Sequence, residues 1–194
     1  LQSGTGTLGG TLTKAAVGGV ANFTGLGANI NLVGSKVLRS NKADTSGSGG
    51  TTAITRDSNS FTIVHAPASQ LVFTTQPANP TGAGTEIASV VEVRDTYGNI
   101  VSTGADATAT VSLSLQSGTG PLLGSSSMAA VGGVANFSGR NVRLENIGAK
   151  VIRATKGDTT GGGGTGSLTQ DSSGFTINHG PADHLTVTTQ PTDP

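Results

Sequence analysis

The stretch VGGVANF occurs twice in this chain, at residues 17–23 and again at residues 131–137. The opening stretch LQSGTG recurs with the same separation. Residues 1–80 can be laid over residues 115–194 without a gap, and more than half of the overlaid positions are identical. Because self-similarity at a fixed period marks a repeated structural unit, the chain contains a repeat unit of about 114 residues, the size of an ordinary domain.

Apolar and polar residues alternate through this unit, which is the pattern of half-buried β-strands. In EIASVVEVRD one face would carry Ile87, Ser89, Val91, Val93 and Asp95. In ATATVSLSLQ one face would carry Val111, Leu113 and Leu115. About seven such stretches are separated by turn signals at intervals of roughly ten residues, and none shows a helical stripe. The pattern predicts an all-β fold, a β-sandwich.

The repeated stretch itself predicts a strand that is entered through two glycines. Its apolar anchors would be Val20 and Phe23, and Val134 and Phe137 in the second copy. Phenylalanine is scarce, and fully burying one such side chain is worth about 1.5–3 kcal/mol. We therefore expect all five phenylalanines to carry much of the bulky packing: Phe23, Phe61, Phe73, Phe137 and Phe175.

Three motifs resemble those of bacterial immunoglobulin-like repeats of the invasin/intimin type. VVEVRDTYGNIV resembles the strand and turn V-x-V-x-D-x-x-G-N-x-V, GGVANFSG resembles the strand G-V-A-x-F, and IGAKVIRA resembles the strand G-x-x-x-(L/I)-x-A. The resemblance implies tandem immunoglobulin-like sandwiches on a cell surface or in an extracellular fibre, and it implies no catalytic residues. The chain departs from the family pattern at Lys36 and Lys150, where the family usually has an aromatic or apolar residue.

The offset between the copies predicts where the domains lie. Residues 1–66 would be the C-terminal part of a first immunoglobulin-like repeat, residues 69–180 a complete repeat, and residues 183–194 the first strand of a third. The copies begin and end out of phase with the chain, so we expect a segment of a longer repetitive protein.

Composition excludes several classes of function. The chain has 11 Lys and Arg against 11 Asp and Glu and no cysteine. A neutral surface lacks the basic footprint of a nucleic-acid or anionic-membrane binder, and no apolar run is long enough for a membrane helix. The absence of cysteine rules out disulfides and thiol chemistry. It is compatible with an extracellular location and also with a cytosolic one.

Lys36 and Lys150 occupy the same repeat position and are the most unusual candidates. If Ile152 and Ala154 point inward, so does Lys150, and a buried ammonium group must be paired or neutralised. Three alternatives stay open: a lysine that reaches solvent at the sandwich edge, a buried ion pair, or an isopeptide bond to an Asn or Asp side chain.

The partner in a buried ion pair could be Asp95, which faces inward by the same counting, or Glu86. If the side-chain phase is the opposite one, Arg39 and Arg153 face inward instead, and the same question applies to them.

Other candidate sites are weaker. GTGTLG at residues 4–9 matches a dinucleotide-binding pattern but lies among strands, without the helix that pattern requires, so we expect no cofactor. A single His beside each Pro-containing linker falls short of a metal site, although calcium at the domain junctions stays open. The sequons NFT and NFS mark possible glycosylation at Asn22 and Asn136.

Two functions compete. The first is a structural stalk or filament, non-enzymatic, whose subunits contact copies of themselves head to tail; Leu185, Val187 and Thr189 would form an inter-subunit strand. The second is a cell-surface adhesin module that binds a glycan or a host protein. Adhesive loops usually carry aromatic platforms, whereas Tyr97 is the only tyrosine here. No catalytic set occurs in both copies, so we expect no enzyme.

Overall fold

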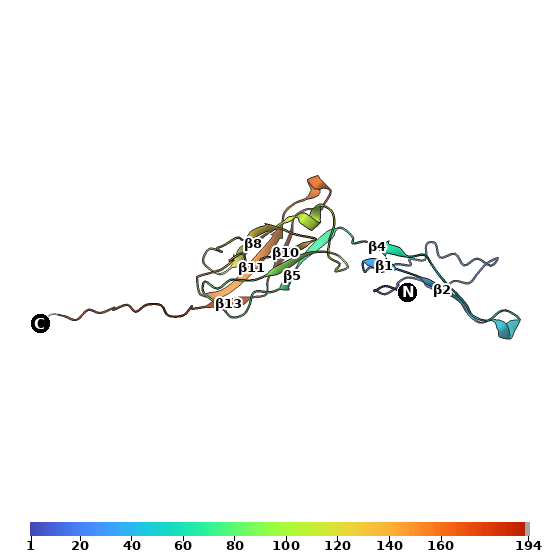
Figure 1. The fold of residues 1–194 in the computed structure, drawn as a ribbon, viewed down its shortest axis with the longest axis horizontal. Helices are drawn as coiled ribbons and strands as arrows, with labels where there is room; N and C mark the ends of the chain where they lie inside the picture. The colour runs from blue at the N-terminus through green and yellow to red at the C-terminus, as the bar shows by residue number, and fades with distance from the viewer. Residues whose placement is uncertain (193–194) are drawn as a thin grey trace.

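A computed structural model describes residues 1–192 of the chain, which is elongated (Figure 1). The N-terminal part lies at one end, a block of strands lies in the middle, and an extended segment runs out to the C-terminus. The prediction of an all-β chain is confirmed, since the only helical elements are short 3₁₀ turns within the described residues, η1 (Ser46–Ser48), η2 (Ala105–Thr108) and η3 (Thr160–Gly162).

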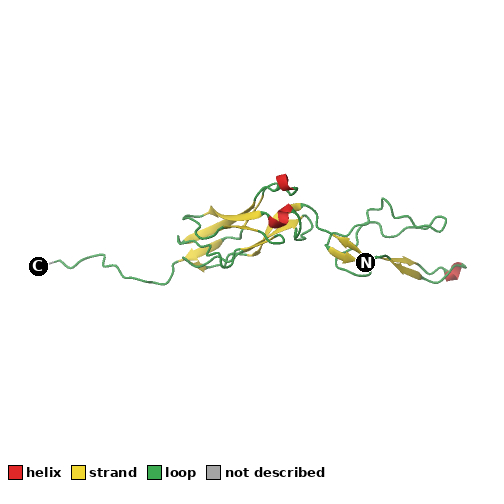
Figure 2. Ribbon diagram, turned by 45° about the horizontal axis from the view of Figure 1, so that its top comes forward, coloured by secondary structure: helices red, strands yellow, loops and turns green. Residues whose placement is uncertain are grey.

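Residues 68–178 form what we call the closed unit. Its strands are β5 (Ala68–Thr75), β6 (Thr81–Gly82), β7 (Val90–Asp95), β8 (Thr110–Ser117), β9 (Ser127–Ala129), β10 (Val134–Asn136), β11 (Gly148–Lys156), β12 (Leu168–Asp171) and β13 (Phe175–Asn178). One sheet has the order β10-β7-β5, and a six-stranded sheet has the order β6-β13-β11-β8-β9, with β12 also pairing β11. The two layers face each other (Figure 2), an arrangement consistent with a β-sandwich. Its immunoglobulin-like topology stays a prediction.

The core of the closed unit lies between these sheets, where the strand alternation places it. The predicted inward face of β7 and the residues before it is buried throughout, from Ile87 to Asp95 at every second position. Val111 and Leu113 of β8 are also buried, and Leu115 packs partly against the same cluster. Both alternating faces that the sequence predicts are therefore confirmed.

The two glycines of VGGV form a tight turn. Gly132 and Gly133 have φ angles of 57° and 80°, and Val131 and Val134 exchange backbone hydrogen bonds of 2.9 and 3.1 Å. Positive φ at both central residues is typical of a type I′ hairpin turn, which glycine adopts without steric cost. Residues 17–20 repeat the same turn, so the two glycines are required by the backbone in both copies.

The prediction of Val134 as a core anchor is wrong. Ala135 and Phe137 are fully buried, whereas Val134 is only half-buried. Successive side chains of a strand point to opposite faces, so residues three apart cannot share the core face. Val20 of the first copy is also exposed.

Residues 1–63 form what we call the open unit. It contains β1 (Gly34–Lys36), β2 (Arg39–Lys42), β3 (Ile54–Asp57) and β4 (Phe61–Ile63), which form two separate two-stranded sheets, β1-β4 and β2-β3. It has no counterpart of β5, β6 or β7. The remaining segments of this unit make only isolated bridges among the described residues.

Two of the five phenylalanines depart from the prediction that they pack in a core. Phe23 is 42% exposed and Phe61 is 37% exposed, while their counterparts Phe137 and Phe175 are 0% and 2% exposed. The local sequence is the same, but the open unit lacks the opposing strands. Phe73 is buried as predicted.

Residues 183–192 are extended and contain no strand in the part that the structure describes. Leu185 is 99% exposed, and Val187 and Thr189 are also exposed. A strand needs a hydrogen-bonded neighbour, and β5, the counterpart of this segment, finds one in β7. The strand predicted for residues 183–194 therefore stays a prediction, and its last two residues lie outside the described chain.

Candidate functional site

The most elaborate polar arrangement joins the open unit to the closed unit. The turn after β7, from Asp95 to Asn99, lies against residues 31–33 of the open unit and against the linker that ends at Ala66. This turn belongs to the DTYGN motif, whose Gly98 has a φ of 84°. Asp95 N and Asn99 O, 2.9 Å apart, close the turn, which holds both side chains toward the open unit.

Asp95 is the centre of this contact. Its fully buried carboxylate accepts hydrogen bonds from the backbone N–H groups of Tyr97, Asn99 and Ala66, each at 2.9 Å. The Asn99 side chain donates a fourth, also at 2.9 Å. One carboxylate therefore ties the turn to the linker between the units, because Ala66 belongs to that linker.

Asn99 extends the contact to the open unit. Its Nδ2 donates to the carbonyl oxygen of Asn31 at 2.7 Å, and its Oδ1 accepts from the N–H of Val33 at 3.2 Å. Both partners are backbone groups, so the contact does not depend on which side chains occupy positions 31 and 33. Asn99 and Asp95 are both buried.

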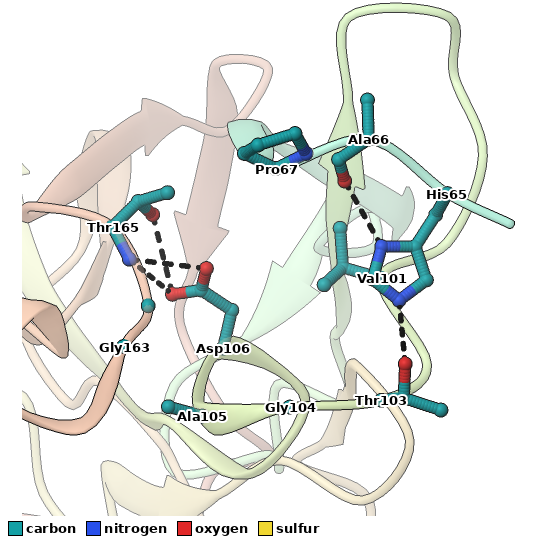
Figure 3. Close-up of a pocket in the computed structure, with 11 residues that line it drawn as sticks. His65, Ala66, Pro67, Val101, Thr103, Gly104, Ala105, Asp106, Gly163 and Thr165 are labelled. Carbon is teal, nitrogen blue, oxygen red and sulfur yellow. Dashed lines mark hydrogen bonds between the residues drawn. The ribbon is translucent and has the colours of Figure 1, made fainter.

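His65 adds a further hydrogen bond across the linker. Its Nδ1 lies 2.9 Å from the carbonyl oxygen of Ala66, and its Nε2 lies 2.8 Å from the hydroxyl of Thr103 (Figure 3). A carbonyl can only accept, so Nδ1 carries a proton, and in the neutral ring Nε2 accepts from Thr103. The histidine that the sequence places beside the linker is thus a junction residue that bonds to the linker and to Thr103.

The hydrogen bonds keep Asp95 ionised. Burial alone would raise the pKa of the Asp95 carboxyl, but the hydrogen bonds from the Asn99 side chain and from the backbone of Ala66, Asn99 and Tyr97 outweigh it, and the pKa is lowered from 3.8. Its contribution to stability is therefore present above the ordinary pKa and is lost as the pH falls through the lowered one. The junction is held by a charged acceptor at neutral pH.

Next to the linker the closed unit has an open pocket of about 380 Å³ (Figure 3). His65 and Pro67 lie on one side, and Asp106 and Thr165 lie on the other. Asp106 does not offer a free charge to the pocket, because it is already paired with a lysine behind it.

That lysine is Lys156, at the end of β11, and the pair is buried. Lys156 Nζ lies 2.7 Å from Asp106 Oδ1, with side chains that are 0% and 6% exposed. The ammonium group also donates to the carbonyl oxygens of Gly157, Thr165 and Gly166 and to the Thr159 hydroxyl. Asp106 accepts from the backbone N–H of Thr165, which fixes the loop after β11 to η2.

The ion pair of Lys156 and Asp106 should make the stability of the closed unit depend on pH in the acidic range. Burial alone would raise the pKa of Asp106, but Lys156 and the hydrogen bonds from Thr159 and Thr165 lower it from 3.8 to about 2. The pair therefore stabilises the closed unit above about pH 4, and this contribution, about 2 kcal/mol, is lost as the pH falls through about 2. Urea unfolding measures the free energy of unfolding of the wild type and of Asp106→Asn. The difference between the two should become smaller by about 2 kcal/mol when the pH is lowered from 6 to 2. If this difference stays the same at both pH values, the lowered pKa of Asp106 is contradicted.

Lys36 and Lys150 are buried, as the strand phase predicts, but they do not pair with Asp95 or Glu86. Lys150 Nζ donates to the carbonyl oxygens of Thr119 and Ile147 at 3.0 and 3.2 Å. Lys36 Nζ donates to the carbonyl oxygen of Val33 at 3.0 Å. Both ammonium groups are satisfied by backbone carbonyls. The expected partner Asp95 is instead occupied by N–H donors, and Glu86 accepts from the N–H of Asn141.

The opposite phase, with inward arginines, is not the one observed. Arg39 and Arg153 form surface ion pairs with Asp57 and Asp171, each with a closest distance of 2.6 Å.

The ion pair of Lys156 and Asp106 was not predicted from the sequence. Lys156 lies in the same strand phase as Lys150, Ile152 and Ala154, and that phase was the available signal for its burial. Nothing local to Asp106 marks it as the partner.

The two sequons lie on the surface. Asn22 Oδ1 accepts from the N–H of Thr24 at 2.8 Å, and Asn136 Oδ1 accepts from the N–H of Ser138 at 2.9 Å. Both asparagines are exposed, and these bonds use the oxygen rather than the nitrogen that would carry a sugar. Glycosylation at Asn22 and Asn136 stays a prediction.

Within residues 1–192 no group of three or more His, Cys, Asp or Glu is arranged to hold a metal ion. Over the same residues no helix is long and apolar enough to cross a membrane.

No family model matches the chain, and no curated protein matches it significantly. The resemblance to immunoglobulin-like repeats therefore depends on the quoted motifs alone.

Proposed function

We propose that this chain is a structural protein, a stalk or filament segment of tandem immunoglobulin-like units outside the cell, in which the Asp95–Asn99 turn fixes each unit against the one before it. The observation that carries the proposal is the binding of Asn99 to the backbone of residues 31 and 33, together with the binding of Asp95 to the linker. Domains joined by a linker move relative to each other unless a contact restrains them. A buried, hydrogen-bonded contact of this kind supports a role in keeping a rod straight.

The roles of the buried charged groups also support this proposal. The buried charges described above hold loops and turns in place, and each is satisfied by hydrogen bonds or an opposite charge. Head-to-tail contact with copies of the same unit, and the location on a cell surface or in an extracellular fibre, rest on the resemblance of the motifs.

The Asn99→Ala variant tests the proposal. Loss of the side-chain hydrogen bonds to Asn31, Val33 and Asp95 should weaken the contact by about 1–3 kcal/mol and free the two units to move. Because the chain has no cysteine, spin labels at Ser48→Cys and Ser125→Cys, both exposed sites, report the distance between the units. We expect a narrow distance distribution in the parent and a broad one in Asn99→Ala.

Asn31→Ala is the matched control, because the contact uses the main-chain oxygen of Asn31 and not its side chain. Its distance distribution should equal that of the parent. Thermal unfolding of each variant checks that the closed unit remains folded. A broad distribution in the parent, or an unchanged one in Asn99→Ala, would contradict a restraining junction.

A further inference from the structure

Asn136 lies at the edge of a sheet in the closed unit. Strand β10, which ends at Asn136, is the outer strand of the sheet β10-β7-β5. Its neighbour Ala135 pairs with Val91 of β7, and the N–H of Phe137 donates to the carbonyl oxygen of Ser89 at 2.9 Å. The backbone groups of successive residues in an antiparallel strand point to opposite sides, so those of Asn136 point away from β7.

The side chain of Asn136 is held in a short turn. Its Oδ1 accepts a hydrogen bond from the backbone N–H of Ser138 at 2.9 Å, the arrangement of an Asx turn. Its Nδ2 donates no hydrogen bond within residues 1–192, and both Asn136 and Ser138 are exposed. The turn therefore uses the oxygen of the carboxamide and leaves the nitrogen, the atom to which a sugar is attached in this motif, facing solvent.

The other copy of the repeat has the same arrangement. Asn22 Oδ1 accepts from the backbone N–H of Thr24 at 2.8 Å, and both residues are exposed. Many other overlaid positions differ between the copies, and here Thr24 is replaced by Ser138. This replacement keeps the hydroxyl that the motif requires, so both the motif and its turn are retained in two stretches that have otherwise diverged.

We propose that Asn136 is an acceptor site for an asparagine-linked sugar and that the folded closed unit presents it. In the transfer a bond forms between Nδ2 and C1 of the sugar, while the bond between C1 and a phosphate oxygen of a lipid-linked glycosyl phosphate breaks. The phosphate leaves with the electron pair of that bond, and the amide gives up one proton to a base of the transferase.

A sugar at Asn136 also protects the edge of the sheet. Unpaired N–H and C=O groups at such an edge can pair with a strand of another chain. The backbone groups of Asn136 have no backbone partner among the described residues, and a bulky, hydrophilic sugar on the same residue hinders such pairing. Transfer takes place on chains that leave the cytoplasm, so this inference rests on the extracellular location that we propose.

The test uses the folded full chain, a polyprenyl-linked oligosaccharide donor and a purified asparagine-linked oligosaccharyltransferase. Mass spectrometry of proteolytic peptides measures the fraction of Asn136 that carries the sugar. Ser138→Ala should abolish transfer, because it removes the hydroxyl of the motif but keeps the backbone N–H that closes the turn. Thermal unfolding checks that each variant remains folded.

Arg143→Ser is the matched control, because it creates a second motif, N-V-S, at the exposed Asn141. There the backbone N–H of residue 143 donates to the carbonyl oxygen of Leu123 at 3.0 Å, so it is not free to close a turn on Asn141. We expect transfer to Asn141 to be at least about tenfold slower than transfer to Asn136, as for one lost hydrogen bond. In an unfolded peptide of residues 131–145 with the same substitution, the two asparagines should react at similar rates.

Two results would overturn the proposal. In the first, the peptide accepts the sugar at Asn136 and the folded chain does not. In the second, Asn136 and Asn141 react equally fast in the folded Arg143→Ser chain. Either result leaves the junction at Asn99 untouched, because the distance measurements on Asn99→Ala do not involve the sugar. A broad distance distribution in the parent chain would in turn contradict the junction and leave the acceptor site in place.

Discussion

Replacing Lys156 by methionine is expected to lower the free energy of unfolding of the closed unit by about 3–5 kcal/mol. The change removes the ammonium group that lies 2.7 Å from the buried Asp106 carboxylate, and with it the hydrogen bonds that Lys156 donates to the carbonyl oxygens of Gly157 and Gly166. A charge left unpaired in a buried site is far more costly than the net worth of the pair itself. Urea unfolding followed by circular dichroism measures the effect.

Two further variants show whether the burial of the pair is the cause. Lys42→Met makes the same chemical change at the equivalent, exposed position and should alter stability by no more than about 0.5 kcal/mol. The double variant Lys156→Met with Asp106→Leu should recover most of the loss, because it leaves no unpaired charge. A double variant as unstable as Lys156→Met would point to lost packing instead.

Phe137→Ala is expected to destabilise the closed unit by a similar amount, about 3–5 kcal/mol. Phe137 is fully buried in the core between the two sheets, so truncation loses apolar burial and leaves a cavity. Small domains are stable by only about 5–15 kcal/mol, so this single change removes a large part of the total. The same urea titration reports it as a lower midpoint with an unchanged slope.

Phe23→Ala is the matched control, since the seven residues that end at each phenylalanine are identical. Phe23 is 42% exposed, and its truncation should cost less than about 1 kcal/mol in the isolated chain. Equal effects at Phe23 and Phe137 would mean that the open unit has a core of its own.

The pair of phenylalanines also shows what the sequence can and cannot predict. The strand period correctly placed Val91, Val93 and Asp95 on the core face, because alternation is a local property of the backbone. The same reasoning could not distinguish Phe23 from Phe137, whose neighbours in the chain are identical. Burial depends on strands that are distant in sequence, and only one of the two copies has them.

For the buried charges, the sequence likewise predicted burial but not the bonding partners. The phase of β11 predicted that Lys150 is buried, but its partners are backbone carbonyls, which no sequence pattern marks. Asp95 was expected to face a lysine and instead receives four N–H donors from its own turn and the linker. Asp106 meets Lys156 only because η2 and the loop after β11 lie at the same end of the closed unit.

The hydrogen bonds of Asn99 to the open unit tolerate changes of sequence at the positions that they contact. Its two partners there are main-chain atoms, which every residue type except proline provides, so substitutions at positions 31 and 33 leave the joint intact. The corresponding residues of the closed unit, Glu145 and Ile147, already differ from Asn31 and Val33. In the structural protein that we propose, such a junction would let surface residues diverge and units be duplicated, deleted or exchanged while the spacing between neighbouring units is kept.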